Sequence, residues 1–301
     1  MKPTIVILMG GPSSEHDVSL STGRAMQRAC KNLGYSTLPI HFNHEIIRHL
    51  DVLRKADLVL IALHGGMGEN GRIQGMLESL GIRYSGSDAL SSAMCMDKHI
   101  SKLLVKDIGI RTPKWSQLRK DDIDSLPKIT YPCVVKPNSE GSTIGLTIVK
   151  KESKLKDAMK LAFHYDDEIL IEDYIGGKEL TVSIVGNDVL PIVEIQPTHS
   201  VYDYECKYTK GLTKYICPAD LPKDLTEKIQ KKSLKIFKLL KCRHYGRVDF
   251  RLDENNQCWF LEVNTLPGMT ETSLLPKSAS AGGMSFDQLI QEIITQSFNE
   301  V

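Results

Sequence analysis

Residues 246–264, GRVDFRLDENNQCWFLEVN, contain two stretches of alternating apolar and polar residues joined by the polar turn DENNQ. This alternation predicts an antiparallel β-hairpin with one buried face. Pairing Leu252 with Trp259 sets the register, because every further pair then follows by counting along the two strands. The buried face would carry the pairs Val248–Val263, Phe250–Leu261 and Leu252–Trp259.

The other face of this hairpin places Asp249 opposite Glu262 and Arg247 opposite Asn264. Like charges directly across an antiparallel pair are destabilising, so two facing carboxylates indicate a cation between them. Carboxylate and carboxamide oxygens are ligands that suit Mg²⁺ held against substrate phosphates. The alternative, from the residues alone, is an exposed hairpin whose outer face is merely charged.

The composition excludes several classes of protein. With 301 residues, 41% of them hydrophobic and 25% charged, the chain is expected to be a soluble globular protein of two or three domains. Its 38 basic and 37 acidic residues give a net charge of +1, which argues against a nucleic-acid partner. The apolar runs are too short for a signal peptide or a membrane span, so no membrane association and a cytoplasmic location are expected. Seven cysteines without a CxxC pair predict reduced thiols.

Strand and helix signals alternate along the first part of the chain, which predicts an α/β fold with a mostly parallel sheet there. Strands are expected at 4–9, 36–40 and 56–63. An amphipathic helix should follow the loop GGPSSEHD and end at Gly34, and a short helix is expected at 73–80.

The rest of the chain is predicted to contain more antiparallel structure. Strands at 131–137 and 146–150 read as a hairpin over the glycine-rich tip NSEGSTIG, and 168–175 and 179–186 are further strands. Helices are expected at 96–108 and 225–240, the second with its lysines on a solvated face. Residues 197–221 have little regular pattern, which is typical of a lid or a binding loop.

The tip NSEGSTIG could hold phosphate oxygens through its backbone N–H groups and the hydroxyls of Ser139, Ser142 and Thr143, with Lys136 adding positive charge. A turn also needs glycine, so this signal is weak by itself. The chain has neither the G-x-G-x-x-G spacing after its first strand nor a Walker GxxxxGK[ST] motif, which excludes a plain Rossmann site and a P-loop. Glu15, at the start of the first helix, is either a capping acid or a substrate ligand.

The order of these segments resembles the ATP-grasp superfamily, and in detail the D-alanine–D-alanine ligase family, over essentially the whole chain. The resemblance lies in GGPSSEHDVSLSTG (10–23), HGGMGENGRIQGMLE (64–78), MDKHISK (96–102), VVKPNSEGSTIG (134–145), EDYIGGKELTV (172–182), YDYECKYTKG (202–211) and GRVDFRLD with FLEVNTLPGMTETSLLP (260–276). It implies an ATP-grasp fold with an N-terminal substrate-binding α/β domain (1–95), a central lid subdomain (96–180) and a C-terminal catalytic subdomain (181–301).

The resemblance implies ATP as co-substrate and two Mg²⁺ or Mn²⁺ ions. It assigns to the ATP phosphates Lys98, Lys136, Ser142 and Lys207. It assigns to adenine and ribose Glu172, Tyr174, Ile175 and Glu179. The metal ligands that it implies are Asp249, Glu262 and Asn264. Glu262 would bridge the two ions.

The family reaction implies a role for each remaining site residue. A first D-alanine would be phosphorylated on its carboxylate, and the amine of a second would attack the acyl phosphate. Arg247 and the Gly268 N–H would stabilise the resulting oxyanion. The residues assigned to the amino acids are Glu15 (first ammonium), His64 (first carboxylate), and Ser273 with the Leu274 N–H (second carboxylate). Tyr208 would link to Ser142 and Glu15 and favours an amine nucleophile over a hydroxy acid.

Three functions remain open at this stage. The first is D-alanyl-D-alanine synthesis for peptidoglycan by a cytoplasmic homodimer. The second is an ATP-grasp ligase for another carboxylate and another amine or hydroxy acid, such as D-lactate. The third is a nucleotide-binding relative without catalysis, which would be expected to have lost a metal ligand or Arg247, and both are present.

Overall fold

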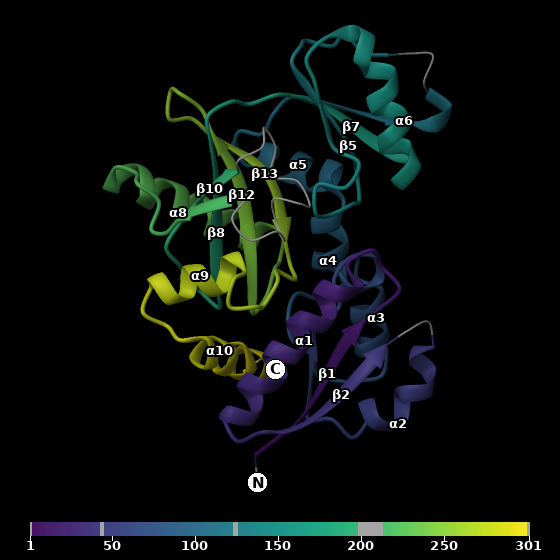
Figure 1. Cartoon of the computed structure of the whole chain (residues 1–301), viewed down its shortest axis with the longest axis vertical. Helices are drawn as coiled ribbons and strands as arrows, with labels where there is room; N and C mark the ends of the chain where they lie inside the picture. The colour runs from purple at the N-terminus through teal and green to yellow at the C-terminus, as the bar shows by residue number, and fades with distance from the viewer. Residues whose placement is uncertain (1, 43–44, 123–125, 198–212, 300–301) are drawn as a thin grey trace.

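The computed structural model describes residues 2–42, 45–122, 126–197 and 213–299. These residues form a mixed α/β protein with three sheets arranged along the long axis of the molecule (Figure 1). The sheet nearest the N-terminus is parallel, and the other two are antiparallel. The predicted α/β class, with its parallel sheet in the first part of the chain, is confirmed.

The N-terminal sheet has the strand order β2-β1-β3. Its strands are β1 (Thr4–Gly10), β2 (Ser36–Phe42) and β3 (Leu58–Ile61), and the helices of this region are α1 (His16–Asn32), α2 (Leu50–Leu53) and α3 (Arg72–Ser79) with the 3₁₀ turns η1 (Ile46–His49) and η2 (Gly66–Gly68). Ile5 to Met9 are fully buried, as expected for a parallel strand covered on both faces. Helix α1 ends as predicted, with Gly34 at a φ of +79°.

The last helix of the chain, α10 (Phe286–Phe298), contacts both α1 and β3, and Figure 1 shows it beside α1. Its buried Ile290 and Ile293 belong to the same hydrophobic cluster as Leu60. The two ends of the chain therefore share one core. The predicted domain limits stay a prediction, and the limit at 180/181 falls inside the strand β8 (Lys178–Val185).

Two glycines that flank α3 differ in their surroundings. Both have a left-handed backbone, with φ of +89° at Gly71 and +65° at Gly81. A Cβ at Gly71 would lie 2.4 Å from the Ala89 carbonyl oxygen, whereas none of the described atoms lies within 4 Å of one at Gly81. Only Gly71 is therefore constrained by a close backbone approach as well as by its φ.

We expect Gly71→Ala to destabilise the fold more than Gly81→Ala. The second change should cost about 1–2 kcal/mol, the usual penalty of a left-handed L-residue, and the first adds a clash with the backbone. Thermal unfolding followed by circular dichroism would compare the two variants with the wild type. Equal losses of melting temperature would contradict the contribution of the Ala89 contact.

The four-stranded sheet has the order β4-β7-β5-β6. Its elements are β4 (Trp115–Arg119), β5 (Cys133–Pro137), β6 (Thr147–Val149) and β7 (Glu168–Asp173), with α6 (Leu155–Tyr165) and the 3₁₀ turns η3 (Lys120–Asp122) and η4 (Glu152–Lys154). Strands β5 and β6 pair antiparallel, which confirms the predicted hairpin over the glycine-rich tip. Strand β4 and helix α6 were not predicted.

The six-stranded sheet has the order β11-β10-β8-β12-β13, and β9 pairs with β8. Its elements are β8 (Lys178–Val185), β9 (Asp188–Val189), β10 (Val193–Pro197), β11 (Thr213–Ile216), β12 (Tyr245–Leu252) and β13 (Cys258–Asn264), with helices α8 (Lys223–Leu239) and α9 (Leu274–Ala281). Helix α8 buries Ile229, Ile236 and Phe237 as predicted. The expectation of a long loop at 197–221 is wrong for residues 213–216, which form β11 and pair with β10.

The β12–β13 hairpin keeps the predicted register only in its first half. Arg247 lies opposite Asn264 and Asp249 opposite Glu262, but the register shifts between Asp249 and Phe250. Beyond the shift, Phe250 and Leu252 pair with Phe260 and Cys258 instead of the predicted Leu261 and Trp259. The irregularity turns the fully buried Phe260 into the core and leaves Leu261 on a cavity wall.

The predicted helix at 96–108 corresponds to α5 (Lys98–Asp107), and a second helix, α4 (Ala89–Met96), precedes it. Helix α4 ends where α5 begins, and Asp97 between them has an extended backbone. The Asp97 carboxylate accepts a hydrogen bond of 2.9 Å from the Ile100 N–H, which caps α5. The prediction therefore found α5 to within two residues at its start, where Asp97 caps it, and missed α4.

The cysteines of the described residues are all free thiols, in agreement with the expectation of reduced cysteines. None of the helices that the structure describes is both long and apolar enough to cross a lipid bilayer.

Candidate active site

Two adjoining cavities lie where the three sheets approach one another. The first, of about 1050 Å³, is lined by the β5–β6 tip, the β7–β8 connection and the polar face of the β12–β13 hairpin. The second, of about 1570 Å³, is lined by the start of α1, the same tip, and the segment from β13 to α9. Both volumes include space that is open to solvent, so these cavities are clefts that a small-molecule ligand could enter. The residues they share are Lys98, Glu140, Gly141, Arg247 and Glu262.

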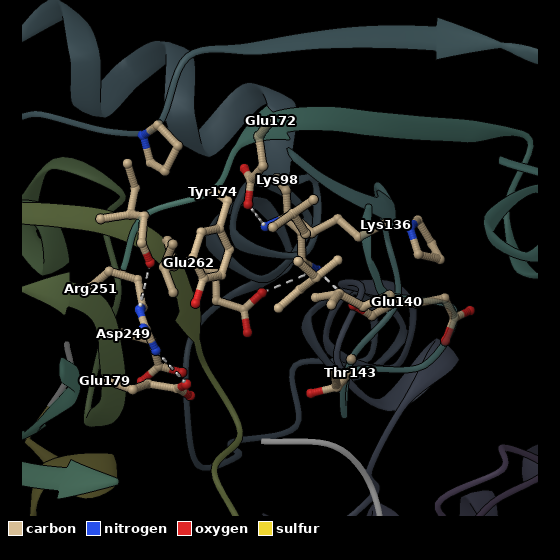
Figure 2. Close-up of a pocket in the computed structure, with 18 of the residues that line it drawn as sticks. Lys98, Lys136, Glu140, Thr143, Glu172, Tyr174, Glu179, Asp249, Arg251 and Glu262 are labelled. Carbon is tan, nitrogen blue, oxygen red and sulfur yellow. Dashed lines mark hydrogen bonds and ion pairs between the residues drawn. The ribbon is translucent and has the colours of Figure 1, made fainter. Parts of the chain in front are cut away.

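The two facing carboxylates of the hairpin are each paired with a cation. Asp249 accepts hydrogen bonds of 2.9 Å from both Nε and Nη2 of Arg247, and one of 2.5 Å from the Thr181 hydroxyl. Glu262 lies 3.3 Å from Nζ of Lys98, as Figure 2 also shows. These two side chains offset the repulsion between the carboxylates, whereas the sequence led us to expect a metal ion there, and the metal ion stays a prediction.

The oxygen ligands on this face fit a divalent cation. Asp249 and Glu262 line the first cavity, and Asn264 lines the second beside Glu262. The Asn264 side-chain oxygen accepts from the Leu266 N–H at 2.9 Å, and a carbonyl oxygen has a second lone pair for a metal. The described residues contain no group of three or more His, Cys, Asp or Glu side chains placed for a metal, so the set is two carboxylates and one carboxamide. Hard oxygens of this kind suit Mg²⁺.

Two buried lysines face the first cavity from different elements (Figure 2). Lys98, at the start of α5, donates a 2.6 Å hydrogen bond to the Glu140 carbonyl oxygen in the tip. Lys136, on β5, forms a 2.7 Å ion pair with Glu172 on β7. Both lysines are 6% exposed, so their charges are little screened by water and can act strongly on an anion in the cavity.

The β5–β6 tip reaches the start of α1. The Ser142 hydroxyl donates a hydrogen bond to the buried Glu15 carboxylate, across the second cavity. Ser142 and Thr143 have positive φ of 50° and 63°, a conformation that costs energy and is common in ligand-clamping loops. Ser139 lies elsewhere, with its N–H bound to Asp166 at 2.7 Å. Ser142 and Thr143 thus line the cavities, whereas Ser139 lines neither of them.

His64 is held between two partners on the wall of the second cavity. Its Nε2 lies 2.9 Å from the Thr22 hydroxyl and its Nδ1 lies 3.3 Å from Glu69. The imidazole is 5% exposed, so its orientation is fixed by these contacts. Sequence reasoning missed Glu69, although it lies in the same glycine-rich segment as His64.

The far end of the second cavity contains Gly268, Ser273 and Leu274. A Cβ at Gly268 would lie 2.9 Å from the Ser273 hydroxyl, so any side chain at 268 would require this hydroxyl to move. Ser273 immediately precedes α9, and Leu274 is the first residue of that helix. The backbone N–H groups at such a helix start can bind a carboxylate.

The β7–β8 connection brings Glu172, Tyr174, Ile175 and Glu179 to the first cavity. Arg251, on the same hairpin face as Asp249, binds the Ile175 and Gly177 carbonyl oxygens at 3.1 and 2.8 Å and Glu179 at 3.2 Å. Sequence reasoning missed Arg251. The alternation of the hairpin could have found it, because residues 247, 249 and 251 share one face.

Apart from Ser139, the structure therefore brings to these two cavities every predicted site residue that it describes. Lys207 and Tyr208 lie outside the described residues. Glu140 was also not singled out from the sequence: its backbone binds Lys98, and burial raises the pKa of its carboxyl group against the opposing effect of Lys98.

The chain is similar to known proteins over nearly its full length. Family models described as the N-terminus and the C-terminus of D-ala D-ala ligase match residues 42–87 and 104–295. The D-alanine–D-alanine ligase of Aquifex aeolicus (strain VF5) is 43% identical over 97% of this chain and 99% of its own length.

Two solved structures have the same fold. The Bacillus anthracis D-alanine–D-alanine ligase complexed with ATP is 39% identical, with a TM-score of 0.84 over 99% of this chain and 98% of that one. The VanG D-Ala:D-Ser ligase of Enterococcus faecalis is 29% identical, with a TM-score of 0.86 over 99% of this chain and 100% of that one. Because the family models cover most of the chain and the relatives align from end to end, this protein belongs to the D-alanine–D-alanine ligase family and is a ligase.

Proposed function

We propose that this ligase joins two D-alanines to D-alanyl-D-alanine, with conversion of ATP to ADP and phosphate. The observation that carries the proposal is that two cavities meet at Lys98, Arg247 and Glu262. A nucleotide in the first cavity and two amino acids in the second would then meet beside these shared charged residues. Transfer of a phosphoryl group depends mainly on such positioning and electrostatic stabilisation.

ATP would occupy the first cavity. The solved Bacillus anthracis relative with bound ATP supports a nucleotide site in this fold. Lys98, Lys136 and Ser142 would contact the phosphates, and Lys207 would join them. Adenine and ribose would lie against Glu172, Tyr174, Ile175 and Glu179, which line this cavity.

Asp249, Glu262 and Asn264 would hold two Mg²⁺ or Mn²⁺ ions. Bound there, the ions would supply positive charge that offsets the charge on the phosphate oxygens. The donor set of two carboxylates and one carboxamide fits this role, although the ions would have to compete with Arg247 and Lys98 for the two carboxylates.

The reaction would pass through an acyl phosphate. A carboxylate oxygen of the first D-alanine attacks the γ-phosphorus of ATP, and ADP leaves. The amine of the second D-alanine then attacks the acyl carbon, loses a proton and expels phosphate. Arg247 and the Gly268 N–H would stabilise the oxyanion between these two events.

The amino acids would be held by groups around the second cavity. Glu15 would pair with the first ammonium and His64 would lie near the first carboxylate, while Ser273 and the Leu274 N–H would bind the second carboxylate. The hydrogen bond from Ser142 to Glu15 supports closure of the β5–β6 tip over these substrates, a closure that Tyr208 would complete.

The test is phosphate release from ATP and Mg²⁺ with D-alanine, with L-alanine as control and with products identified by mass. We expect one phosphate per D-alanyl-D-alanine and no release with L-alanine. ATP turnover absent with D-alanine would overturn the proposal.

A second candidate is ligation of D-alanine to another nucleophile. It is favoured by the similarity to the VanG D-Ala:D-Ser ligase, whose chain aligns over its whole length. Parallel reactions of D-alanine with D-serine and with D-lactate would decide, because a mixed product in excess of D-alanyl-D-alanine would favour this candidate. A peptidoglycan role, a cytoplasmic location and a homodimer are carried over from the family as part of the main proposal.

A further inference from the structure

Helix α5 buries two lysines on its inner face. Its buried residues are Lys98, Ser101, Lys102 and Val105, at the three- and four-residue spacing of a helix side that faces the interior. Lys98 reaches the cavity, but Lys102 is 0% exposed and lines neither cavity. A fully buried ammonium is costly unless it is paired and hydrogen-bonded, so its contacts require an explanation.

The Lys102 ammonium joins three parts of the site. Its Nζ forms an ion pair of 2.9 Å with Glu172 on β7 and a hydrogen bond of 2.8 Å to the Thr112 hydroxyl. Thr112 in turn donates to the Phe260 carbonyl oxygen on β13 at 2.9 Å. The same ammonium lies 5.8 Å from the centre of the Trp115 ring on β4. Lys102 thereby connects the four-stranded sheet to the strand that carries Glu262.

Glu172 is bound by two lysines at once. Lys136 contacts one of its carboxylate oxygens at 2.7 Å and Lys102 contacts the other at 2.9 Å. Burial would raise the pKa of Glu172, but the two lysines outweigh burial and hold that pKa below its ordinary value. Burial in turn lowers the pKa of Lys102 to about 8, a shift that Glu172 opposes.

The two lysines differ in what they can do when a nucleotide arrives. Lys136 lines the first cavity and can turn from Glu172 to a phosphate, whereas Lys102 lies behind Glu172 and is not part of the cavity wall. If Lys136 turned from Glu172 to a phosphate, Lys102 would still hold the Glu172 carboxylate in its ionised form and in its place.

We propose that Lys102 is a positioning residue of the nucleotide cavity, which holds the Glu172 carboxylate in place to receive the base and leaves Lys136 available for phosphate. The proposal rests on the proposed ATP site. It makes Lys102 responsible for nucleotide affinity although it touches no substrate.

The test compares Lys102→Met, Lys102→Arg and Lys106→Met in the full chain. Lys106 is the matched control, because it lies 5.6 Å from the centre of the same Trp115 ring but on the exposed side of α5. We expect Lys102→Met to raise the KM for ATP by about tenfold or more, because it removes one partner of a buried ion pair, with the KM for D-alanine unchanged. Lys102→Arg should recover part of the affinity, and Lys106→Met should match the wild type.

Direct binding of ADP by calorimetry separates this inference from the proposed function. If wild type binds ADP and Lys102→Met binds it equally well, the positioning role is wrong. If wild type binds no nucleotide, the proposed function fails first. A parallel loss of affinity for ATP and D-alanine would indicate a merely structural role and would also overturn the inference.

If Lys102→Met does not fold, the pH dependence of ADP binding to wild type decides. The charged groups around Lys102 are Glu172, Lys136 and Glu262. Because Lys102 loses its proton above a pKa of about 8, its hold on Glu172 should weaken there, and the Kd for ADP should rise between pH 8 and 9.5 at constant Mg²⁺. A Kd that is unchanged over this range would contradict the proposal.

Discussion

Glu262→Gln is expected to lower kcat by about 100-fold or more and to raise the Mg²⁺ concentration needed for half-maximal activity. Glu262 lies at the junction of the two cavities and faces Asp249 across the hairpin. An amide keeps the shape of the side chain but removes the negative charge that attracts a divalent cation. Loss of one preorganised electrostatic group at a reacting centre commonly costs about 10²- to 10³-fold in rate.

Asp249→Asn should act in the same direction, and Asp253→Asn supplies the matched control. Asp253 lies in the turn of the same hairpin, where its carboxylate accepts from the Trp259 indole N–H at 2.8 Å. This variant loses a carboxylate from the hairpin without changing the polar face at the cavities. Mg²⁺ titration of phosphate release would compare the three variants. An unchanged Mg²⁺ requirement in Glu262→Gln would contradict the assignment of Glu262 as a metal ligand.

In the β12–β13 hairpin, the sequence predicted which charged residues face each other but not the shift in register. Alternation predicted the facing of Asp249 and Glu262, because side chains on a strand must alternate between the two faces. The register shift was not predictable in this way. Phe260 and Leu261 are adjacent apolar residues competing for one buried position, and only packing against the rest of the core decides between them.

Contacts between distant segments needed the family resemblance. The glycine-rich tip was evident from its residues, but its meeting with Glu15, 127 positions away, depends on how the sheets are placed. The parallel strand β1 was predictable because its residues are apolar on both faces. Helix α4, whose serines Ser91 and Ser92 are buried, lacks such a clear pattern and was missed.

Lys102 illustrates a signal that was present in the sequence but ambiguous. It stands four residues after Lys98, on the same face of one helix. Lysines at helical spacing usually form a solvated face, as the exposed Lys228, Lys231, Lys235 and Lys238 of α8 illustrate. Only burial and the Glu172 contact distinguish the two cases, and both depend on tertiary structure.

Arg247→Ala is expected to lower kcat by about 10²- to 10³-fold, the usual effect of removing an oxyanion-stabilising donor. Arg247→Lys should lose less, since it retains the charge but not the planar fork that binds both Asp249 oxygens at 2.9 Å. Steady-state kinetics at saturating ATP and D-alanine would measure both losses. Wild-type kcat in the alanine variant would exclude Arg247 from the oxyanion role.

Arg247→Ala should also change the Mg²⁺ requirement, in the direction opposite to the change in Asp249→Asn and Glu262→Gln. Arg247 competes with a cation for Asp249, because its guanidinium occupies both carboxylate oxygens. Removing it leaves Asp249 with the Thr181 hydroxyl as a neutral partner, so the attraction of Asp249 for Mg²⁺ should increase. Arg247→Ala should therefore reach half-maximal activity at a lower Mg²⁺ concentration, whereas Asp249→Asn and Glu262→Gln need a higher one. If all three variants required more Mg²⁺, Arg247 would support the metal site instead of competing with it, and the low kcat of Arg247→Ala would reflect a disturbed metal site.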